Sequence, residues 1–195
     1  MTQLGPIAAI LSVLALHQAL PAQEIDYQVY TESPRLLLNQ RRLRLLKRER
    51  ERESMRWQQF DALLSGKARM SEPGFTQALW SVVTAQPGAC RQAAEWAVSS
   101  PANTPASLRQ VALVFDWCQS SAGEALSNLM ARRLASSLKE RSPQPAAVRS
   151  RVFAALAVAD TDPQAAQDYL KFAVESWWRQ TIAPRLKTGQ NPFSS

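Results

Sequence analysis

The stretch ASLRQVALVFDWC, residues 106–118, decides the fold class of this 195-residue chain. Its apolar side chains fall on most sides of a helix, and such a helix must be buried on most sides. Residues 146–159, AAVRSRVFAALAVA, are also mostly apolar after their first turn. The segments around these two are amphipathic. This alternation predicts two layers of helices, in which an outer row covers an inner one.

The rest of the chain also carries helical signals. Strand-type alternation is sustained nowhere, and Pro, Gly and Ser residues separate the periodic segments. We predict an all-α fold, an α/α helical-hairpin array that forms an incomplete (α/α) toroid of about six to seven helices. The other expected helices are 39–66, with Asn39 as N-cap and Gly66 as stop, 75–86, 89–98, 124–140, and a last helix that begins at Pro163 and is stopped by Pro184.

The N-terminus has the pattern of an export signal. An apolar run, IAAILSVLAL over residues 7–16, precedes a small-residue region that ends at Ala22. No Lys or Arg precedes the run, and a core helix is the alternative interpretation. Cleavage near Ala22 predicts a periplasmic or secreted protein that begins at Gln23, has no histidine and makes no membrane contact after signal cleavage.

The domain organisation follows from these boundaries. Pro34 disfavours helical geometry at the residue before it, and residues 35–38 (RLLL) have the pattern of a short buried strand. The expected divisions are a signal peptide over 1–22, an extended lead-in over 23–38, the α/α helical domain over 39–188 and a tail over 189–195.

Cys90 and Cys118 are the two cysteines of the chain. Export places them where disulfides form, and without histidine they cannot build an ordinary zinc site. If residues 89–99 and 106–119 form an antiparallel hairpin, both cysteines lie at the same end of it. Free buried cysteines are common in helical cores, so a disulfide and two free thiols both remain open.

The net charge of +7 is concentrated in one segment. Nine Lys/Arg and three Glu residues lie in residues 35–56, which gives that segment a charge of +6. The run RRLRLLKRERERESMR, residues 41–56, suits acidic partners. The alternative is a solvated helix face whose charges pair at helical spacing, as Lys47 would with Glu51. No aromatic residues interleave with the cations, so we expect no nucleic-acid partner.

Four residues are candidate glycan contacts. Asp116 and Trp117 stand within the buried segment, where a carboxylate must be paired or face a polar cavity. Trp177 and Arg179 flank another tryptophan, and these three side chains cannot all face one core. Tryptophan rings stack on sugars in grooves, but at helical spacing they usually belong to the core. The structural alternative predicts a buried Asp116 that is hydrogen-bonded by a capped helix end, an Arg or a Trp N–H.

The sequence offers little for catalysis. The mature chain has no Ser–His or Cys–His pairing, no glycine-rich phosphate loop and no metal-binding cluster, so we expect no catalytic residue, no metal site and no cofactor. General acid–base chemistry would depend on carboxylates or on Tyr27, Tyr30 and Tyr169, of which the last is far from the others in sequence.

Short motifs resemble a known family. The lead-in PRLLL (34–38) before an Arg/Leu-rich helix and Trp57, the stretch LVFDW (113–117) and the final IAPRL (182–186) are similar to the heparinase II/III-like and alginate-lyase-like α/α toroid proteins. The resemblance implies a secreted or periplasmic protein whose relatives eliminate across uronic-acid linkages of acidic polysaccharides. Those lyases use a Tyr with a His or Asn partner on later helices, and none of these residues carries over to this chain.

Two functions follow as expectations. The first is an exported helical domain like the N-terminal part of a polysaccharide lyase, catalytically incomplete on its own and able to bind acidic polysaccharide. The second is a non-enzymatic interaction protein of the bacterial envelope that uses the basic helix of residues 41–56 against acidic partners. A cytoplasmic nucleic-acid binder would require the export signal to be misread. Apolar surface left by missing helices predicts self-association.

Overall fold

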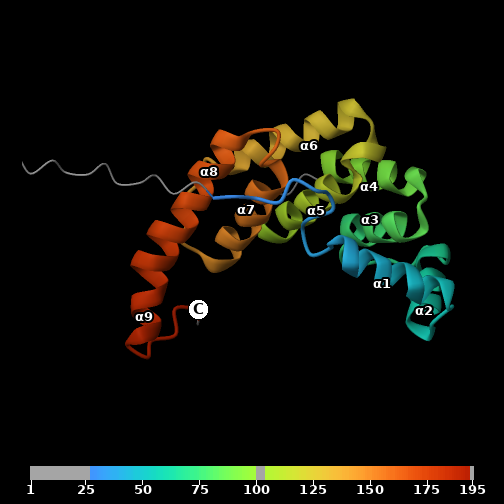
Figure 1. Ribbon diagram of the computed structural model, residues 1–195, viewed down its shortest axis with the longest axis horizontal. Coiled ribbons are helices and arrows are strands. Elements are labelled where there is room, and N and C mark those ends of the chain that lie inside the picture. The colour runs from blue at the N-terminus through green and yellow to red at the C-terminus, as the bar shows by residue number, and fades with distance from the viewer. Residues whose placement is uncertain (1–26, 100–103, 194–195) are drawn as a thin grey trace, which may run out of the picture.

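The computed structural model describes residues 27–99 and 104–193, and within these ranges the chain is an all-α array of packed helices. Figure 1 shows the helices along the long axis, from α1 (Gln40–Glu51) and α2 (Met55–Ser65) at one end to α9 (Ala183–Lys187) at the other. In this part of the chain, no helix combines the length and the apolar character that a membrane crossing requires. The expected signal peptide lies outside the described residues, so export stays a prediction.

Proline begins five of the helices. The first N–H groups of a helix have no partner within it, so a residue without an N–H costs nothing there. Side chains cap two of these helices: Thr104 accepts from the N–H of Ser107 at 3.2 Å, and Asp162 from that of Ala165 at 3.2 Å. The five are α3 (Pro73–Thr84), α4 (Pro87–Ser99), α5 (Pro105–Ala122), α7 (Pro145–Val158) and α8 (Pro163–Lys171).

Helix α5 is the centre of the fold. Twelve of its 18 residues are buried, and it packs against α3, α4, α6 (Glu124–Ser137) and α7. Helix α7, the second mostly apolar segment, lies directly on α5. The prediction of an all-α array built around nearly all-apolar helices is therefore confirmed.

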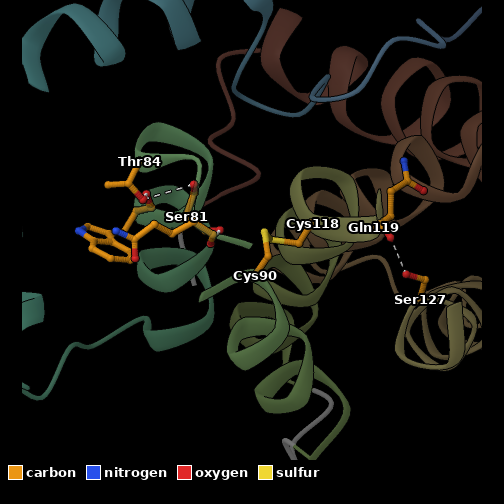
Figure 2. The surroundings of a disulfide bond; sticks show 8 residues. Ser81, Thr84, Cys90, Cys118, Gln119 and Ser127 are labelled. Atoms are coloured by element: carbon orange, nitrogen blue, oxygen red, sulfur yellow. Dashed lines mark hydrogen bonds between the residues drawn. A yellow bond between two sulfur atoms is a disulfide. The ribbon is translucent and has the colours of Figure 1, made fainter. Parts of the chain in front are cut away.

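A disulfide joins the beginning of α4 to α5, as Figure 2 shows. The Cα atoms of Cys90 and Cys118 are 5.2 Å apart, and both residues are buried. Of the two states that the sequence left open, the structure has the disulfide. Nearby, the hydroxyl of Ser127 on α6 donates to the carbonyl of Gln119 at 2.9 Å, which ties α6 to α5 (Figure 2).

The prediction of one long helix over residues 39–66 is wrong, because the chain breaks between α1 and α2. Glu53 is left-handed, with a φ of 49°. The N–H groups of Glu53 and Ser54 bond back to carbonyls of the last turn of α1 at 3.0 Å, which is a Schellman end. Ser54 then caps α2 by accepting from the N–H of Trp57 at 3.3 Å. The left-handed residue is a glutamate, so no glycine marked the break.

Pro184 was expected to stop the last helix, and this is also wrong. Helix α8 continues into a π-helical segment, η1 (Phe172–Ile182), and then into α9. The N–H of Ala183 bonds to the carbonyl of Trp178, five residues back. This change in backbone hydrogen bonding, from four to five residues back, places Pro184 in the first turn of α9. Pro184 has no N–H to donate, and none is needed there. The helix therefore passes the proline and forms the arm at the lower left of Figure 1.

Candidate functional site

The lead-in forms a strap, residues 27–38, that crosses the helices between α8 and α1 (Figure 1). At its start, the N–H of Tyr27 donates to Oε1 of Gln167 at 2.9 Å, and Nε2 of Gln167 donates to the carbonyl of Tyr27 at 2.7 Å. One side-chain amide thus pairs with both backbone groups of a residue, as a neighbouring strand would. The hydroxyl of Tyr27 also donates to Glu175 at 2.8 Å.

At its other end, the strap is held by Asp116 on α5. One carboxylate oxygen accepts from the N–H groups of Arg35 and Leu36, each at 2.8 Å. The other oxygen lies 3.3 Å from Nε of Arg35 and 3.5 Å from the hydroxyl of Ser33. Arg35 pairs in addition with Asp160. The side chains of Arg35 and Asp116 are 4% and 0% exposed, so this is a buried ion pair.

Two opposing effects act on the pKa of this carboxyl. Burial raises the pKa of Asp116 above its ordinary value of 3.8, because the charged form is removed from water. The N–H groups of Leu36 and Arg35, followed by the guanidinium of Arg35, act in the opposite direction. The net direction is upward, so the bonds to the strap compensate only part of the cost of burying the charge.

The strap also covers Trp117. Its indole N–H donates to the carbonyl of Leu36 at 2.9 Å, and its ring lies 5.5 Å from that of Phe75. The strap therefore occupies the surface over Asp116 and Trp117, and the prediction that these two contact a glycan is wrong. The structural alternative for Asp116 is confirmed. Its strongest donors, two backbone N–H groups of the strap, were not among those expected.

The other two candidates lie on η1 at the far end of the array. The indole N–H of Trp177 donates to the carbonyl of Pro143 at 2.7 Å, and Arg179 binds both carboxylate oxygens of Glu175 at 2.9 and 2.8 Å. Both Arg179, whose side chain is 57% exposed, and the neighbouring Trp178, which is 44% exposed, face solvent. Since Asp116 lies under the strap on α5, the four candidates do not form one glycan site.

The tyrosines proposed as acid–base groups lie in three different environments. Tyr27 is bound to Glu175, Tyr30 is 87% exposed, and Tyr169 is fully buried in the core. Across residues 27–99 and 104–193, no group of three or more His, Cys, Asp or Glu side chains is placed to hold a metal ion.

Helix α1 and its C-cap residue present a face of exposed arginines, which we call the arginine face: Arg41, Arg44, Arg48 and Arg52. Their spacing of three and four residues places them on one side of the helix. Leu45, half exposed, lies among them, whereas Leu43 is buried on the opposite side.

The cations of α1 are not neutralised by their neighbours. Arg42 bonds to the carbonyl of Leu37 at 2.9 Å and Arg50 to that of Val83 at 3.3 Å. No ion pair forms on α1 in the part of the chain that the structure describes. The expected pairing of Lys47 with Glu51, and of the other charges at this spacing, is therefore wrong.

A second feature was not singled out in the sequence. A groove of about 940 Å³ lies between the end of α2 and the segment after it (residues 64–71), one side of α3, and the beginning of α4. We call it the α2–α3–α4 groove. Its lining includes Lys67, Arg69 and Trp80 together with three glutamines, and it includes no acidic residue. No sequence motif predicts this groove, because its walls come from helices whose packing no motif specifies.

Comparisons with protein-family models, with curated proteins and with solved structures find no match to this chain.

Proposed function

We propose that this chain is an exported, non-enzymatic helical domain of the cell envelope that binds acidic polysaccharide through the arginine face of α1. The observation that carries the proposal is the combination of exposure and missing ion pairs at Arg41, Arg44, Arg48 and Arg52. Four cations on one helix side repel one another, which costs a few tenths of a kcal/mol per pair. An anionic partner removes that repulsion.

A linear polymer suits the shape of this face. The four arginines follow one another along the outside of α1 over roughly 16 Å, at a rise of about 1.5 Å per residue. Guanidinium groups bind carboxylates and sulfates through two parallel N–H donors. A polysaccharide with a charge on successive sugars meets several of these donors at once.

The same geometry favours a sugar polymer over single-stranded nucleic acid. Stacking on bases requires aromatic rings between the cations, and the arginine face carries Leu45 in that place. The disulfide between Cys90 and Cys118 supports an oxidising compartment, as expected after export. Binding without turnover is proposed because Tyr169 is buried in the core, the Tyr27 hydroxyl is bound to Glu175, and Asp116 is buried beneath the strap.

The test is retention on immobilised alginate and on heparin during a salt gradient. We expect the variant Arg41→Gln/Arg44→Gln/Arg48→Gln to elute at distinctly lower salt than the wild type. The matched control is Arg91→Gln/Arg132→Gln/Arg149→Gln, which removes the same charge from exposed positions on other helices. Equal shifts for both variants would show that net charge alone causes retention, and the proposal would then fail.

Two further expectations accompany the proposal. The intact mass of the exported protein should correspond to a chain that begins at or near Gln23, and a major species that retains Met1 would contradict export. Self-association also stays a prediction, to which the exposed Met55 and Leu63 of α2 add apolar surface. Sedimentation velocity over a range of concentrations measures it, and a monomer throughout would refute it.

A further inference from the structure

The α2–α3–α4 groove has the size and lining of a binding site. Its volume, about 940 Å³, lies within the range of roughly 300–1,000 Å³ that is usual for ligand clefts. Leu64, Met70 and Trp80 give it apolar walls, and each of them is half-buried. The indole N–H of Trp80 is held by Asp61 at 2.7 Å, so this wall is fixed.

The charge of the groove has one sign. Lys67 and Arg69 are exposed, and neither forms an ion pair among the residues that the structure describes. Since the lining contains no carboxylate, the groove favours an anionic ligand. The beginning of α4, at Gly88, adds a smaller contribution of the same sign.

The glutamines make the groove suited to a peptide backbone. Nε2 of Gln77 donates to Oε1 of Gln92, which joins α3 to α4. This bond leaves the Oε1 acceptor of Gln77 and the Nε2 donor of Gln92 without a partner in the described structure. One residue of an extended peptide offers the complementary N–H and C=O. The molecule already uses this chemistry elsewhere, where Gln167 binds both backbone groups of Tyr27.

We propose that the α2–α3–α4 groove binds an extended acidic peptide segment of a partner protein. The amides of Gln77 and Gln92 bind its backbone, Lys67 and Arg69 bind its Asp or Glu side chains, and the apolar walls receive the side chains between them. A sugar could also use the amides and the tryptophan, but it does not require an acceptor and a donor presented as a pair. This site is separate from the arginine face, and the inference does not depend on the polysaccharide proposal.

The experiment uses the full chain with Arg41→Gln/Arg44→Gln/Arg48→Gln as background, so that binding to α1 does not contribute. A phage library of random dodecapeptides is selected on this protein at about 0.15 M salt. The selected peptide is synthesised and titrated calorimetrically. We expect enrichment of Asp and Glu at alternate positions, because alternate residues of an extended strand face the same side.

Three variants of the background protein complete the test. We expect Lys67→Gln/Arg69→Gln and Gln92→Ala each to weaken the selected peptide about tenfold, which is a change of about 1.4 kcal/mol. The control is Arg91→Gln, which removes an exposed cation next to Gln92 but outside the groove and should change affinity less than about twofold. Failure to select any acidic peptide would overturn the proposal, as would a peptide that none of the groove variants weakens. Binding of an alginate octasaccharide that depends on Gln92, without peptide binding, would assign the groove to a sugar instead.

Discussion

Helix α5 is largely buried in the core, whereas helix α2 lies at the surface. Helix α5 buries twelve of its 18 residues, contacts four other helices, and holds both the strap and the disulfide. Helix α2 buries none of its 11 residues, and it is tied to α3 by the bond between Asp61 and Trp80. Cooperative stability therefore resides around α5, while the surfaces that we propose for binding, the arginine face and the groove, lie at the α1–α2 end.

The comparison predicts that equal chemical changes have unequal effects. A lesion near α5 should lower the free energy of unfolding of the whole molecule. A destabilising substitution in α2 should promote local unfolding of that helix, since weakly packed segments open with small free energies. The four predictions below run from the largest expected effect to the smallest.

The largest effect is expected for Asp116→Ala. The change leaves the N–H groups of Arg35 and Leu36 without their buried acceptor, and it leaves the guanidinium of Arg35 with the half-exposed Asp160 in place of its buried partner. Removal of one partner of a buried ion pair costs about 3–5 kcal/mol, and we expect a loss of this size in denaturant unfolding. Asp116→Asn, which keeps an acceptor, should lose less.

The matched control for this prediction is Asp168→Ala, which removes an exposed carboxylate and should cost less than about 0.5 kcal/mol. If Asp116→Ala unfolds at the same denaturant concentration as the wild type, the strap is not anchored at α5 and the comparison breaks down.

The second prediction concerns the double variant Cys90→Ala/Cys118→Ala. The disulfide links residues 28 positions apart, and opening a loop of this length raises the entropy of the unfolded chain enough to cost about 3.5 kcal/mol. We expect a lower melting temperature and faster hydrogen exchange throughout α4 and α5. Wild-type protein treated with a reductant should behave in the same way. An unchanged melting temperature in both preparations would show that the bond adds nothing to this part of the core.

The third prediction compares two substitutions that remove the same kind of helix cap, one from each region. Ser54→Ala and Thr104→Ala each delete a hydroxyl that caps a helix, α2 and α5 respectively, at a cost of about 1 kcal/mol. Thr104→Ala should lower the global melting temperature. Ser54→Ala should leave it unchanged and accelerate amide exchange only over residues 55–65. Equal effects on melting would show that α2 unfolds together with the core.

The smallest effect is a pH dependence at the start of the strap. The hydrogen bond from Tyr27 lowers the pKa of Glu175 below its ordinary value of 4.5. The stabilisation that ionised Glu175 gives to the docked strap is therefore present above pH 4.5 and is lost as the pH falls through the lower, folded pKa. Burial and the bond to Glu175 raise the pKa of Tyr27 above 10.0. The stabilisation that the protonated Tyr27 hydroxyl gives to the docked strap is therefore lost as the pH rises through that raised pKa. Exchange at the N–H of Tyr27 should therefore accelerate, beyond its intrinsic pH dependence, at both extremes. Tyr27→Phe should abolish both transitions.

Much of the fold was predictable because it depends on local patterns. The apolar run of α5 and the prolines at helix starts are readable without knowing what each helix touches. The break at Glu53 was missed because no glycine signals its left-handed conformation. The continuation of the helix through Pro184 was missed because no residue type specifies π-helical hydrogen bonding.

The candidate site was less predictable, since it depends on contacts distant in sequence. The sequence placed Asp116 and Trp117 on a buried helix, but it did not show that residues 33–36 would supply their partners. Likewise, the charges of α1 had helical spacing for ion pairs, yet no ion pair forms among them in the described structure.

The strap has a consequence for the order of folding. Its anchors join residues 80 to 148 positions apart, from Leu36 with Asp116 to Tyr27 with Glu175, whereas the helix pairs beneath it close over short loops. Contacts over such separations carry a large closure entropy before they contribute any stability. The segment near the beginning of the chain should thus dock last, after α8 has formed, with φ-values near zero at Tyr27 and Arg35. Its release should then be the first step of unfolding.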